Sequence, residues 1–242
     1  MTKNPIVARL NAVTFPMIDI EREILSAVNA EIIELEGATD DEILSVAENA
    51  DAVMIVSAYL HGQVIRRMNS LKVISRIGTG TDKIDVAEAT RCGIVVANLP
   101  DFSTEEVADH TLALLLATAR RLKYYESCIR QGHKPFSVAG IHRLSVQTLG
   151  IIGFGRIGKA VAKRALAFGM KVLVHDPFLT PATLENWKVE AVDLDTLLAR
   201  SDYVSLLCPL TAGNREMLGM EQLHVVNPDV TPRFSIIKKQ IV

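Results

Sequence analysis

Cysteine, surplus charge and long hydrophobic runs are all scarce in this chain of 242 residues. Three cysteines are too few for a disulfide framework and lack the spacing of metal ligands: Cys92, Cys128 and Cys208. The formal net charge is −2, so the chain has no excess of positive charge that would attract nucleic acids or anionic membranes. Reduced thiols and balanced charge predict a cytoplasmic protein with no metal, no nucleic-acid partner and no membrane partner.

The longest apolar tract, residues 111–119, is too short to span a bilayer and directly follows Asp109 and His110. The N-terminal residues lack the apolar core of a signal peptide, and the chain shows no internal repeat. With 49% hydrophobic and 22% charged residues, the composition is that of a globular chain. Its length allows one large or two modest domains.

The most informative segment is a glycine-rich turn between an apolar run and an amphipathic stretch. Residues 149–152 are typical of a buried strand, and a helix is predicted to begin near Arg156. Gly153 would allow the tight turn, Gly155 would let a pyrophosphate approach the backbone, and Gly158 would let the helix pack closely. The N–H groups at the start of that helix would favour phosphate.

An acid follows at the spacing expected of a dinucleotide site. After Gly169, a plausible C′ residue, a second strand over residues 171–176 ends in Asp176, which lies 23 positions after Gly153. Such an acid hydrogen-bonds the adenosine ribose and repels a 2′-phosphate, which predicts NAD over NADP. The alternative is a glycine turn that binds nothing, with an ordinary loop acid.

The first 98 residues alternate short apolar runs with amphipathic stretches, which predicts a small doubly wound domain with a mostly parallel sheet covered on both faces. Thr39 and Glu42 form a capping-box pattern. The predicted strands are residues 6–10, 31–35, 52–56, 72–76 and 94–97. The predicted helices are residues 20–28, 41–49, 63–68 and 86–91.

One strand end in this part stands out. Residues 76–82 place two glycines and exposed N–H groups just past a predicted strand. Such a backbone concavity could hold a carboxylate, with Arg76 or Lys83 nearby for charge. An ordinary β–α turn, in which glycine supplies a positive φ, explains the same residues equally well.

Residues 98–101 are predicted to be a linker around Pro100. A second capping box at Ser103 would open a helix over residues 106–121 that is apolar nearly all round, and therefore buried on several sides between domains or subunits. His110 within it is predicted to be a packed or capped core residue. Residues 131–146 are predicted to be a loop.

Two further strands, residues 189–192 and 202–207, are predicted after Asp176, with a helix over residues 194–200 capped by Asp193 between them. The segment 208–211 then lies at the same sheet edge as the glycine turn, where it could contact the cofactor. Alternatively, its proline only ends the strand.

Together these segments resemble NAD-dependent D-isomer-specific 2-hydroxyacid dehydrogenases, the group that includes phosphoglycerate dehydrogenase and the C-terminal-binding corepressors. The resemblance runs in the family's order from residue 1 to about residue 222. The matching segments are residues 71–85, 98–100, 107–116, 149–158, 175–177 and 208–211.

The resemblance implies an α/β protein with a flavodoxin-like substrate domain at residues 1–98 and a Rossmann NAD-binding domain at residues 99–223. It implies a homodimer formed through the cofactor domains and the long apolar helix. It assigns the carboxylate of a small 2-hydroxy or 2-keto acid to Arg76, Gly78, Thr79 and Gly80, with Thr79 also near the nicotinamide. It assigns NAD to Thr79, Gly153, Phe154, Gly155, Arg156, Ile157, Gly158, Asp176, Cys208, Pro209 and Leu210.

The resemblance stops after residue 223. The family continues with an Arg-Gly strand whose arginine binds substrate, a glutamate, and a Pro-His segment whose histidine is the general base. None of these three is found, because Arg233 precedes no glycine and His224 follows no proline. Residues 224–229 resemble the family's extreme C-terminus, as if about two βαβ units were missing before His224. Residues 224–242 would be a tail that could return to the substrate domain.

Two consequences follow from that break. The Rossmann domain would be truncated after its fourth strand, which leaves residues 202–207 as an apolar sheet edge. Hydride transfer would lack a base worth about 10²–10⁴ in rate, and no other histidine is placed at the nicotinamide by its sequence context. The sequence thus predicts an NAD-dependent 2-hydroxyacid oxidoreductase, with a catalytically inactive NAD-binding remnant or a regulatory dimerisation module as the alternative.

Overall fold

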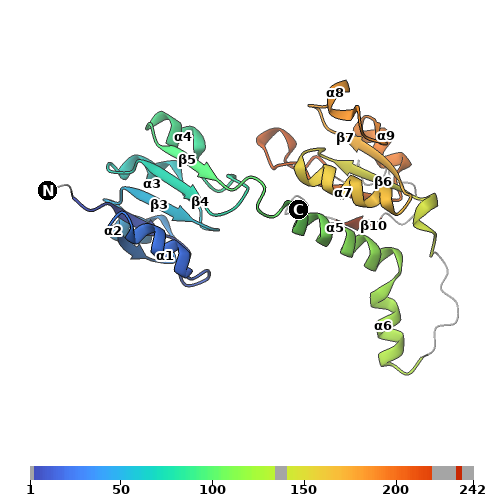
Figure 1. Cartoon of the computed structure of the whole chain (residues 1–242), viewed down its shortest axis with the longest axis horizontal. Coiled ribbons are helices and arrows are strands. Elements are labelled where there is room, and N and C mark those ends of the chain that lie inside the picture. Colours follow the sequence, from blue (N-terminus) through green and yellow to red (C-terminus); the bar gives the residue numbers. More distant parts are fainter. Residues whose placement is uncertain (1–2, 134–140, 220–232, 236–242) are drawn as a thin grey trace. The chain divides into compact units, whose positions relative to one another are not determined.

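The computed structural model describes residues 3–133, 141–219 and 233–235. The chain divides into two compact units, unit 1 (Met1–Phe102) and unit 2 (Ser103–Val242), each with its own sheet (Figure 1). No helix among the described residues is long and apolar enough to cross a membrane.

Unit 1 is built on a five-stranded parallel sheet in the order β2-β1-β3-β4-β5. This is the flavodoxin-like doubly wound order, so the predicted fold class is confirmed for this part. Each predicted element is present to within about two residues. The elements are β1 (Ile6–Arg9), α1 (Asp19–Ser26), β2 (Glu31–Glu34), α2 (Asp40–Ala47), β3 (Ala52–Ile55), α3 (Gly62–Arg67), β4 (Val73–Arg76), α4 (Val86–Arg91) and β5 (Val95–Asn98).

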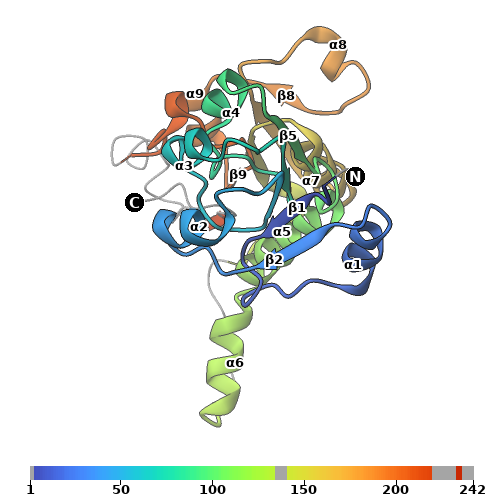
Figure 2. The ribbon, with the colours of Figure 1, turned by 90° about the vertical axis from the view of Figure 1, so that its left-hand side faces the viewer.

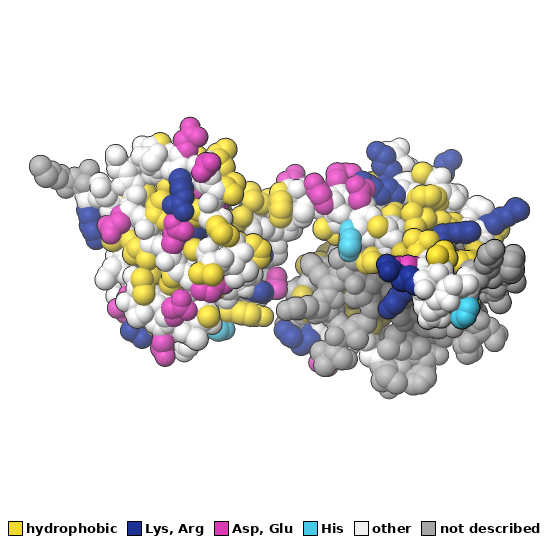
Figure 3. All heavy atoms as spheres, turned by 90° about the horizontal axis from the view of Figure 1, so that it is seen from below, with side chains coloured by type: hydrophobic (Ala, Val, Ile, Leu, Met, Phe, Trp, Pro, Cys, Tyr) yellow, Lys and Arg dark blue, Asp and Glu magenta, His cyan; other side chains and the backbone are white. Residues whose placement is uncertain are grey.

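The two faces of this sheet are covered unequally. Figure 2 shows α1 on one side of the strands and α2, α3 and α4 on the other. The main core lies with α2, α3 and α4, whereas α1 has no buried residue. Ile20 and Ile24 of α1 are 58% and 63% exposed, and Figure 3 shows hydrophobic side chains over the surface of unit 1. The predicted cover of both sheet faces is therefore incomplete among the described residues of unit 1.

The predicted capping box of α2 is half formed. The Thr39 hydroxyl accepts the Glu42 N–H at 3.2 Å. The Glu42 carboxylate reaches one and two residues further back than the motif requires, and accepts the N–H groups of Gly37 and Ala38 at 3.1 and 2.8 Å. These bonds fix the loop before α2, because they give hydrogen-bond acceptors to backbone N–H groups that lie outside the helix.

The carboxyl of Asp51 ties three strands together at the amino edge of this sheet. It accepts the Ile6 N–H at 3.0 Å and pairs with Lys72 at 2.8 Å. The Lys72 hydrogen bond, then the Ile6 N–H, lower the pKa of Asp51 below its ordinary value of 3.8. A lowered native pKa contributes stability that is complete above the unfolded value and is lost as the pH falls through the native value.

We therefore expect Asp51→Asn to lower the thermal midpoint at neutral pH, and the gap from wild type to close as the pH falls below the ordinary value of 3.8 and through the lowered native pKa of Asp51. Thermal unfolding followed by circular dichroism across that range measures it. Exposed Asp101→Asn is the matched control and should leave the wild-type profile unchanged. A gap that stays constant as the pH falls well below 3.8 would show that the Asp51 charge does not stabilise the fold.

Unit 2 is a second parallel sheet in the order β10-β9-β6-β7-β8. It reproduces the first five positions of the Rossmann order 3-2-1-4-5-6, so the predicted Rossmann class is confirmed. The elements are α5 (Thr104–Ala119), α6 (Leu122–Arg130), η1 (Leu144–Val146), β6 (Thr148–Ile152), α7 (Arg156–Ala167), β7 (Lys171–His175), α8 (Pro181–Leu184), β8 (Glu190–Ala191), α9 (Leu194–Arg200), β9 (Tyr203–Leu206), η2 (Ala212–Asn214) and β10 (Arg233–Ser235).

The prediction that the fourth strand forms a bare sheet edge is wrong. β10 pairs with β9 in parallel, with Arg233 opposite Tyr203 and Ser235 opposite Ser205. Unpaired N–H and C=O groups on an apolar strand favour such an addition. Residues 233–235 thus lie in the sheet of unit 2. The break before His224 and the rest of the predicted tail lie outside the described residues.

Two predictions about α5 are also corrected. Ser103 makes no capping bond through its side chain, and His110 is exposed instead of packed. The buried residues of α5 lie on the face packed against α7, and Leu114 on another face is 36% exposed. An alanine- and leucine-rich helix is apolar on every side in sequence even when part of its surface stays exposed within its own unit.

Helix α6 was not predicted. Arg121 adopts a left-handed conformation, with φ at 52°, and this turns the chain into a separate helix directly after α5. Arginine carries no sequence signal for that conformation, which is usually taken by glycine or asparagine. Both views show α6 extending away from the rest of unit 2 (Figures 1 and 2).

Candidate functional site

The three glycines between β6 and α7 differ in the space around them. A Cβ built on Gly153, whose φ is +96°, would lie 2.5 Å from the Cys208 nitrogen. A Cβ on Gly158 would overlap the Gly153 carbonyl oxygen, whereas a Cβ on Gly155 would meet no atom within 4 Å. Gly153 and Gly158 are therefore required by the packing of the protein itself, and Gly155 leaves open space in front of the backbone.

That open space faces the beginning of α7. Gly155 is the N-cap residue, with no side chain to accept the first N–H groups of the helix. Arg156 at the first helical position is exposed. At the other end, Gly169 follows the C-cap residue with φ at +75°, which confirms its predicted C′ role. A helix start with open backbone and a nearby cation is suited to a phosphate.

Both oxygens of the Asp176 carboxylate are held by backbone N–H groups. Oδ2 accepts from Phe154 at 2.8 Å and Oδ1 accepts from Phe178 at 2.9 Å. The Gly153 N–H donates to the carbonyl of His175 at 2.8 Å. Asp176 thus joins the glycine loop to the turn after β7, a bracing role that its spacing alone did not reveal.

The segment after β9 is held by Asn214. Its Oδ1 accepts the Thr211 N–H at 2.7 Å, and its Nδ2 donates to the Pro209 carbonyl at 2.6 Å. Sequence reasoning missed Asn214, although a threonine followed three residues later by an amide resembles a capping box and could have indicated it. The brace fixes the loop of Cys208 and Pro209 against Gly153.

These segments enclose a cavity of about 420 Å³, within the range of small-molecule sites. It brings together four of the predicted cofactor residues, Gly153, Asp176, Cys208 and Pro209. Phe154, another predicted cofactor residue, does not line this cavity: its ring is buried against Trp187, at 5.4 Å between centroids, and its N–H donates to Asp176. The full lining is Ile152, Gly153, His175, Asp176, Pro177, Phe178, Cys208, Pro209, Thr211, Gly213, Asn214 and Met217.

In unit 1, the Arg76 guanidinium is turned towards its own loop. Its Nε donates to the Gly80 carbonyl at 3.0 Å and its Nη1 to the Ile77 carbonyl at 2.5 Å. Burial lowers the pKa of Arg76, and the charge of Asp82 opposes that shift. The other candidate cation, Lys83, donates to the Ser57 carbonyl at 2.6 Å. Both cations thus brace the backbone around the predicted carboxylate site.

The same loop presents free backbone donors. The Thr79 hydroxyl donates to the Leu99 carbonyl at 3.0 Å, and Asn98 donates to the Thr79 carbonyl at 2.8 Å. Within the described part of the chain, no acceptor meets the N–H groups of Thr79 and Gly80. These two donors, together with the positive φ of Gly78, fit the predicted concavity for an anion better than Arg76 does.

Two described histidines have hydrogen-bonding partners of their own. The Nδ1 of His61 in unit 1 lies 2.8 Å from Asp40. His175 lines the cavity, but its Nδ1 contacts the Val192 carbonyl at 3.1 Å. No three His, Cys, Asp or Glu side chains in the described ranges are placed to share a metal ion.

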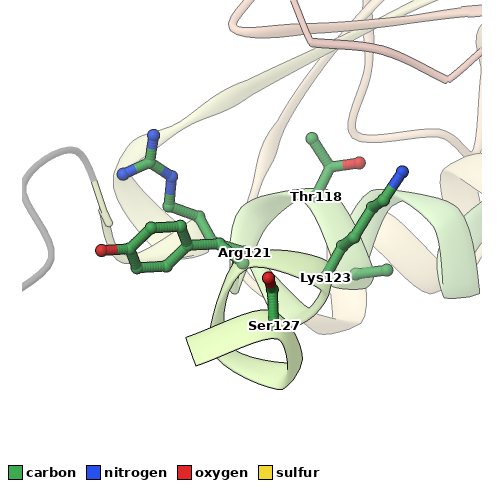
Figure 4. Close-up of a pocket in the computed structure, with 6 residues that line it drawn as sticks. Thr118, Arg121, Lys123 and Ser127 are labelled. Carbon is green, nitrogen blue, oxygen red and sulfur yellow. The ribbon is translucent and has the colours of Figure 1, made fainter. Parts of the chain in front are cut away.

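A second hollow of about 550 Å³ lies at the elbow between α5 and α6. Figure 4 shows Arg121 and Lys123 extending to opposite sides of the elbow, with Thr118 and Ser127 between them. The Arg121 guanidinium lies 5.7 Å from the centre of the Tyr124 ring. An open hollow with apolar walls and cations at its edges is more typical of a surface that binds another protein than of a site that encloses a small ligand.

Comparison with known proteins gives the family. The model of the D-isomer-specific 2-hydroxyacid dehydrogenase NAD-binding domain matches residues 112–231. The chain is 39% identical to D-3-phosphoglycerate dehydrogenase of Methanocaldococcus jannaschii over 216 residues, which is 87% of this chain and 40% of the relative. It is 38% identical to glyoxylate reductase of Thermococcus litoralis over 195 residues, 77% of this chain and 59% of the relative.

Solved structures agree. D-lactate dehydrogenase of Aquifex aeolicus, complexed with NAD and lactic acid, has a TM-score of 0.81 and 29% identity, covering 91% of this chain and 66% of that chain. A protein of Thermus thermophilus has a TM-score of 0.78 and 32% identity over 92% of this chain and 70% of that chain. The chain spans about half the length of the curated relatives named above.

The matched domain binds NAD, in agreement with the cofactor predicted from the glycine loop and Asp176. The relatives are named oxidoreductases, in agreement with the predicted enzyme class. The chain belongs to the D-isomer-specific 2-hydroxyacid dehydrogenase family.

Proposed function

We propose that this protein transfers hydride between NAD and a small 2-hydroxy or 2-keto acid. The observation that carries the proposal is the open backbone at Gly155, which faces the start of α7 beside a carboxylate fixed at Asp176. NAD supplies the hydride acceptor when bound. The residues of the chain bind and orient it: the N–H groups at the start of α7 and Arg156 hold the pyrophosphate, and Asp176 accepts the ribose hydroxyls.

For the substrate, we assign the carboxylate to the N–H groups of Thr79 and Gly80, with Arg76 as the brace that keeps the loop open. Backbone donors fix a carboxylate without titrating, so they hold the acid in one orientation over a broad pH range. Phosphoglycerate, glyoxylate and hydroxypyruvate, named for the relatives, share this carboxylate and are the first substrates to assay.

Two measurements test the proposal. Calorimetric titration with NADH should give saturable binding by the folded protein. Oxidation of NADH in the presence of glyoxylate, hydroxypyruvate, pyruvate or 3-phosphohydroxypyruvate should then be followed by the loss of NADH absorbance. Failure to bind NADH would refute the cofactor assignment, and binding without oxidation would refute catalysis alone.

The second candidate is an NAD-binding module that performs no chemistry. The printed sequence contains no Arg-Gly pair and no Pro-His pair, which the resemblance assigns to substrate binding and to the general base. Tight NADH binding with no turnover of any 2-keto acid would favour this function. Detectable hydride transfer would exclude it.

We further propose that the protein is a cytoplasmic homodimer in which α6 packs on a second copy. Helix α6 has no buried residue, and Leu122 and Ile129 on it are 55% and 69% exposed. An amphipathic helix that extends from its own unit with its apolar side chains in water gains stability by pairing. The family resemblance favours a second copy as the partner.

Ile129→Lys should convert the dimer to a monomer, because an unpaired charge within the contact costs about 2–5 kcal/mol. Light scattering coupled to size-exclusion chromatography at micromolar concentration measures the mass. Val28→Lys, which introduces the same charge at a residue 57% exposed in unit 1, is the matched control. A wild-type protein that is already monomeric, or an unchanged mass for Ile129→Lys, would contradict the proposal.

A further inference from the structure

The amino edge of the unit 2 sheet carries a hollow of about 270 Å³ that the proposed function does not use. It contains the first residues of three strands, Thr148 of β6, Lys171 of β7 and Glu190 of β8. The glycine loop and Asp176 follow the carboxyl ends of β6 and β7, one strand length or about 16 Å away. The hollow is therefore separate from the cofactor cavity. Its full lining is Thr148, Lys171, Val172, Leu173, Lys188, Val189, Glu190 and Arg200.

The charges on this lining are unbalanced. Three of the described lining residues are cations and one is an acid, although the whole chain carries a formal net charge of −2. Both oxygens of that acid, Glu190, are engaged by Arg200, whose Nη1 and Nη2 donate at 2.6 and 2.8 Å. The Arg200 hydrogen bonds contribute most to lowering the pKa of Glu190, burial opposes them, and the charges of Arg200 and Lys171 add to the lowering. In the described part of the chain, Lys171 and Lys188 form no ion pair with an acid.

The backbone at both lysines is held in place. The Lys171 N–H donates to the Gln147 carbonyl at 3.0 Å. Lys188 follows Trp187, whose ring packs on the buried Phe154 ring at 5.4 Å between centroids. Both lysine side chains are exposed, so their ammonium groups lie in water on fixed attachment points. Two like charges held on one hollow repel each other, and an anion bound between them relieves that repulsion.

We propose that this hollow binds a phosphate dianion, which is inorganic phosphate or the phosphate group of a small phosphomonoester. Lys171 and Lys188 donate charge-assisted hydrogen bonds to it, and their two charges match the two charges of the ligand. The volume of about 270 Å³ is just below the roughly 300–1,000 Å³ of ordinary ligand sites, so it admits a phosphate with at most a short substituent. The inference does not rest on the proposed NAD function, because the hollow and the cofactor cavity share no lining residue.

NMR titration of the backbone amides with inorganic phosphate tests the site, with sodium chloride at equal ionic strength as the reference. Amides of residues 171–173 and 188–190 should shift saturably with phosphate and not with chloride, because a bound anion changes the local field only where it is held. Lys171→Gln and Lys188→Gln should each weaken phosphate binding by about tenfold, since each removes one charge-assisted hydrogen bond. Lys163→Gln is the matched control, because Lys163 is an exposed lysine of α7 outside the lining of the hollow.

Thermal midpoints establish that the variants are folded, and glycerol 3-phosphate, which adds a short substituent to the same phosphate group, distinguishes the two sources. Tighter binding of this ester would support a phosphomonoester as the occupant, and equal or weaker binding would support phosphate itself. The absence of saturable shifts, equal shifts with chloride, or unchanged phosphate affinity in either Lys171→Gln or Lys188→Gln would overturn the inference. Shifts at Gly155 without shifts in residues 171–173 would also overturn it, because the phosphate would then occupy the glycine loop, and the proposed NAD function would stay intact.

Discussion

Gly155→Asp should abolish measurable NADH binding while preserving or raising the thermal midpoint of the protein. Gly155 is the N-cap of α7 with φ at −76°, a conformation open to any residue, and a Cβ there meets nothing within 4 Å. Aspartate is a preferred N-cap and its charge favours the positive end of the helix, together worth about 0.5–1 kcal/mol. The fold should therefore accept the change.

The carboxylate introduced by Gly155→Asp would occupy the position that we assign to the pyrophosphate of NADH. Two like charges about 4 Å apart repel by about 4 kcal/mol at an effective dielectric near 20, which corresponds to roughly a thousandfold loss of affinity. Calorimetry with NADH measures the loss, and thermal unfolding measures the fold. Binding within tenfold of wild type would mean that the pyrophosphate does not lie at Gly155.

Gly153→Ala is the matched control, because it adds one methyl group two residues away in the same motif. Its φ of +96° and the approach of its Cβ to 2.5 Å from the Cys208 nitrogen should cost about 2 kcal/mol or more of stability. The two variants therefore separate the glycine that the fold requires from the glycine that the ligand requires. A stable Gly153→Ala would show that the loop can move away from Cys208.

Local chemistry explains why much of the fold could be predicted. Asp193 caps α9 through the Thr196 N–H at 2.8 Å, as its position before an amphipathic run predicted. The helix predicted over residues 86–91 is α4 at the same bounds. Gly169 ends α7 in the left-handed conformation that the C′ position requires. In each case the signal and its structural effect lie within a few residues of each other.

What escaped prediction depends on partners distant in sequence. The pairing of β10 with β9 joins Arg233 to Tyr203, and no local pattern specifies it. The turn at Arg121 uses a left-handed residue without the glycine that would mark it. The side of α5 that packs against α7 is set by a contact between two helices distant in sequence, and an alanine- and leucine-rich run does not show which side that is.

In the candidate site, too, local signals could be predicted from the sequence and contacts between distant residues could not. Spacing identified Asp176 and the glycines, but the roles of Asn214 and Phe178 depend on contacts formed after folding. Arg76 was assigned to an incoming carboxylate because of its charge, whereas its donors are engaged by the carbonyls of Gly80 and Ile77. The sequence shows which residue type lies at a strand end. The fold determines whether the hydrogen-bond donors of that residue are free to bind a ligand or are already engaged by the protein.

Asp176→Ala should weaken NADH binding by about 10- to 100-fold and reduce the preference for NADH over NADPH by at least about tenfold. Charge-assisted hydrogen bonds to the ribose are worth about 1.5–3 kcal/mol. Removing the carboxylate also removes its repulsion of a 2′-phosphate. Competitive titration of NADH against NADPH, on wild type and variant, measures both effects. An NADH affinity within twofold of wild type would refute the assignment of the ribose to Asp176.

Asp176 also braces the site, so this variant needs a control that separates bracing from ribose binding. Alanine leaves the N–H groups of Phe154 and Phe178 without their acceptor, at about 1–2 kcal/mol of stability for a half-buried pair. Asp176→Asn keeps one uncharged acceptor for a single N–H, so it should lose less stability than alanine yet tolerate NADPH equally well. If asparagine instead retained the full preference for NADH, the discrimination would arise from the shape of the braced loop, and the charge of Asp176 would not be its cause.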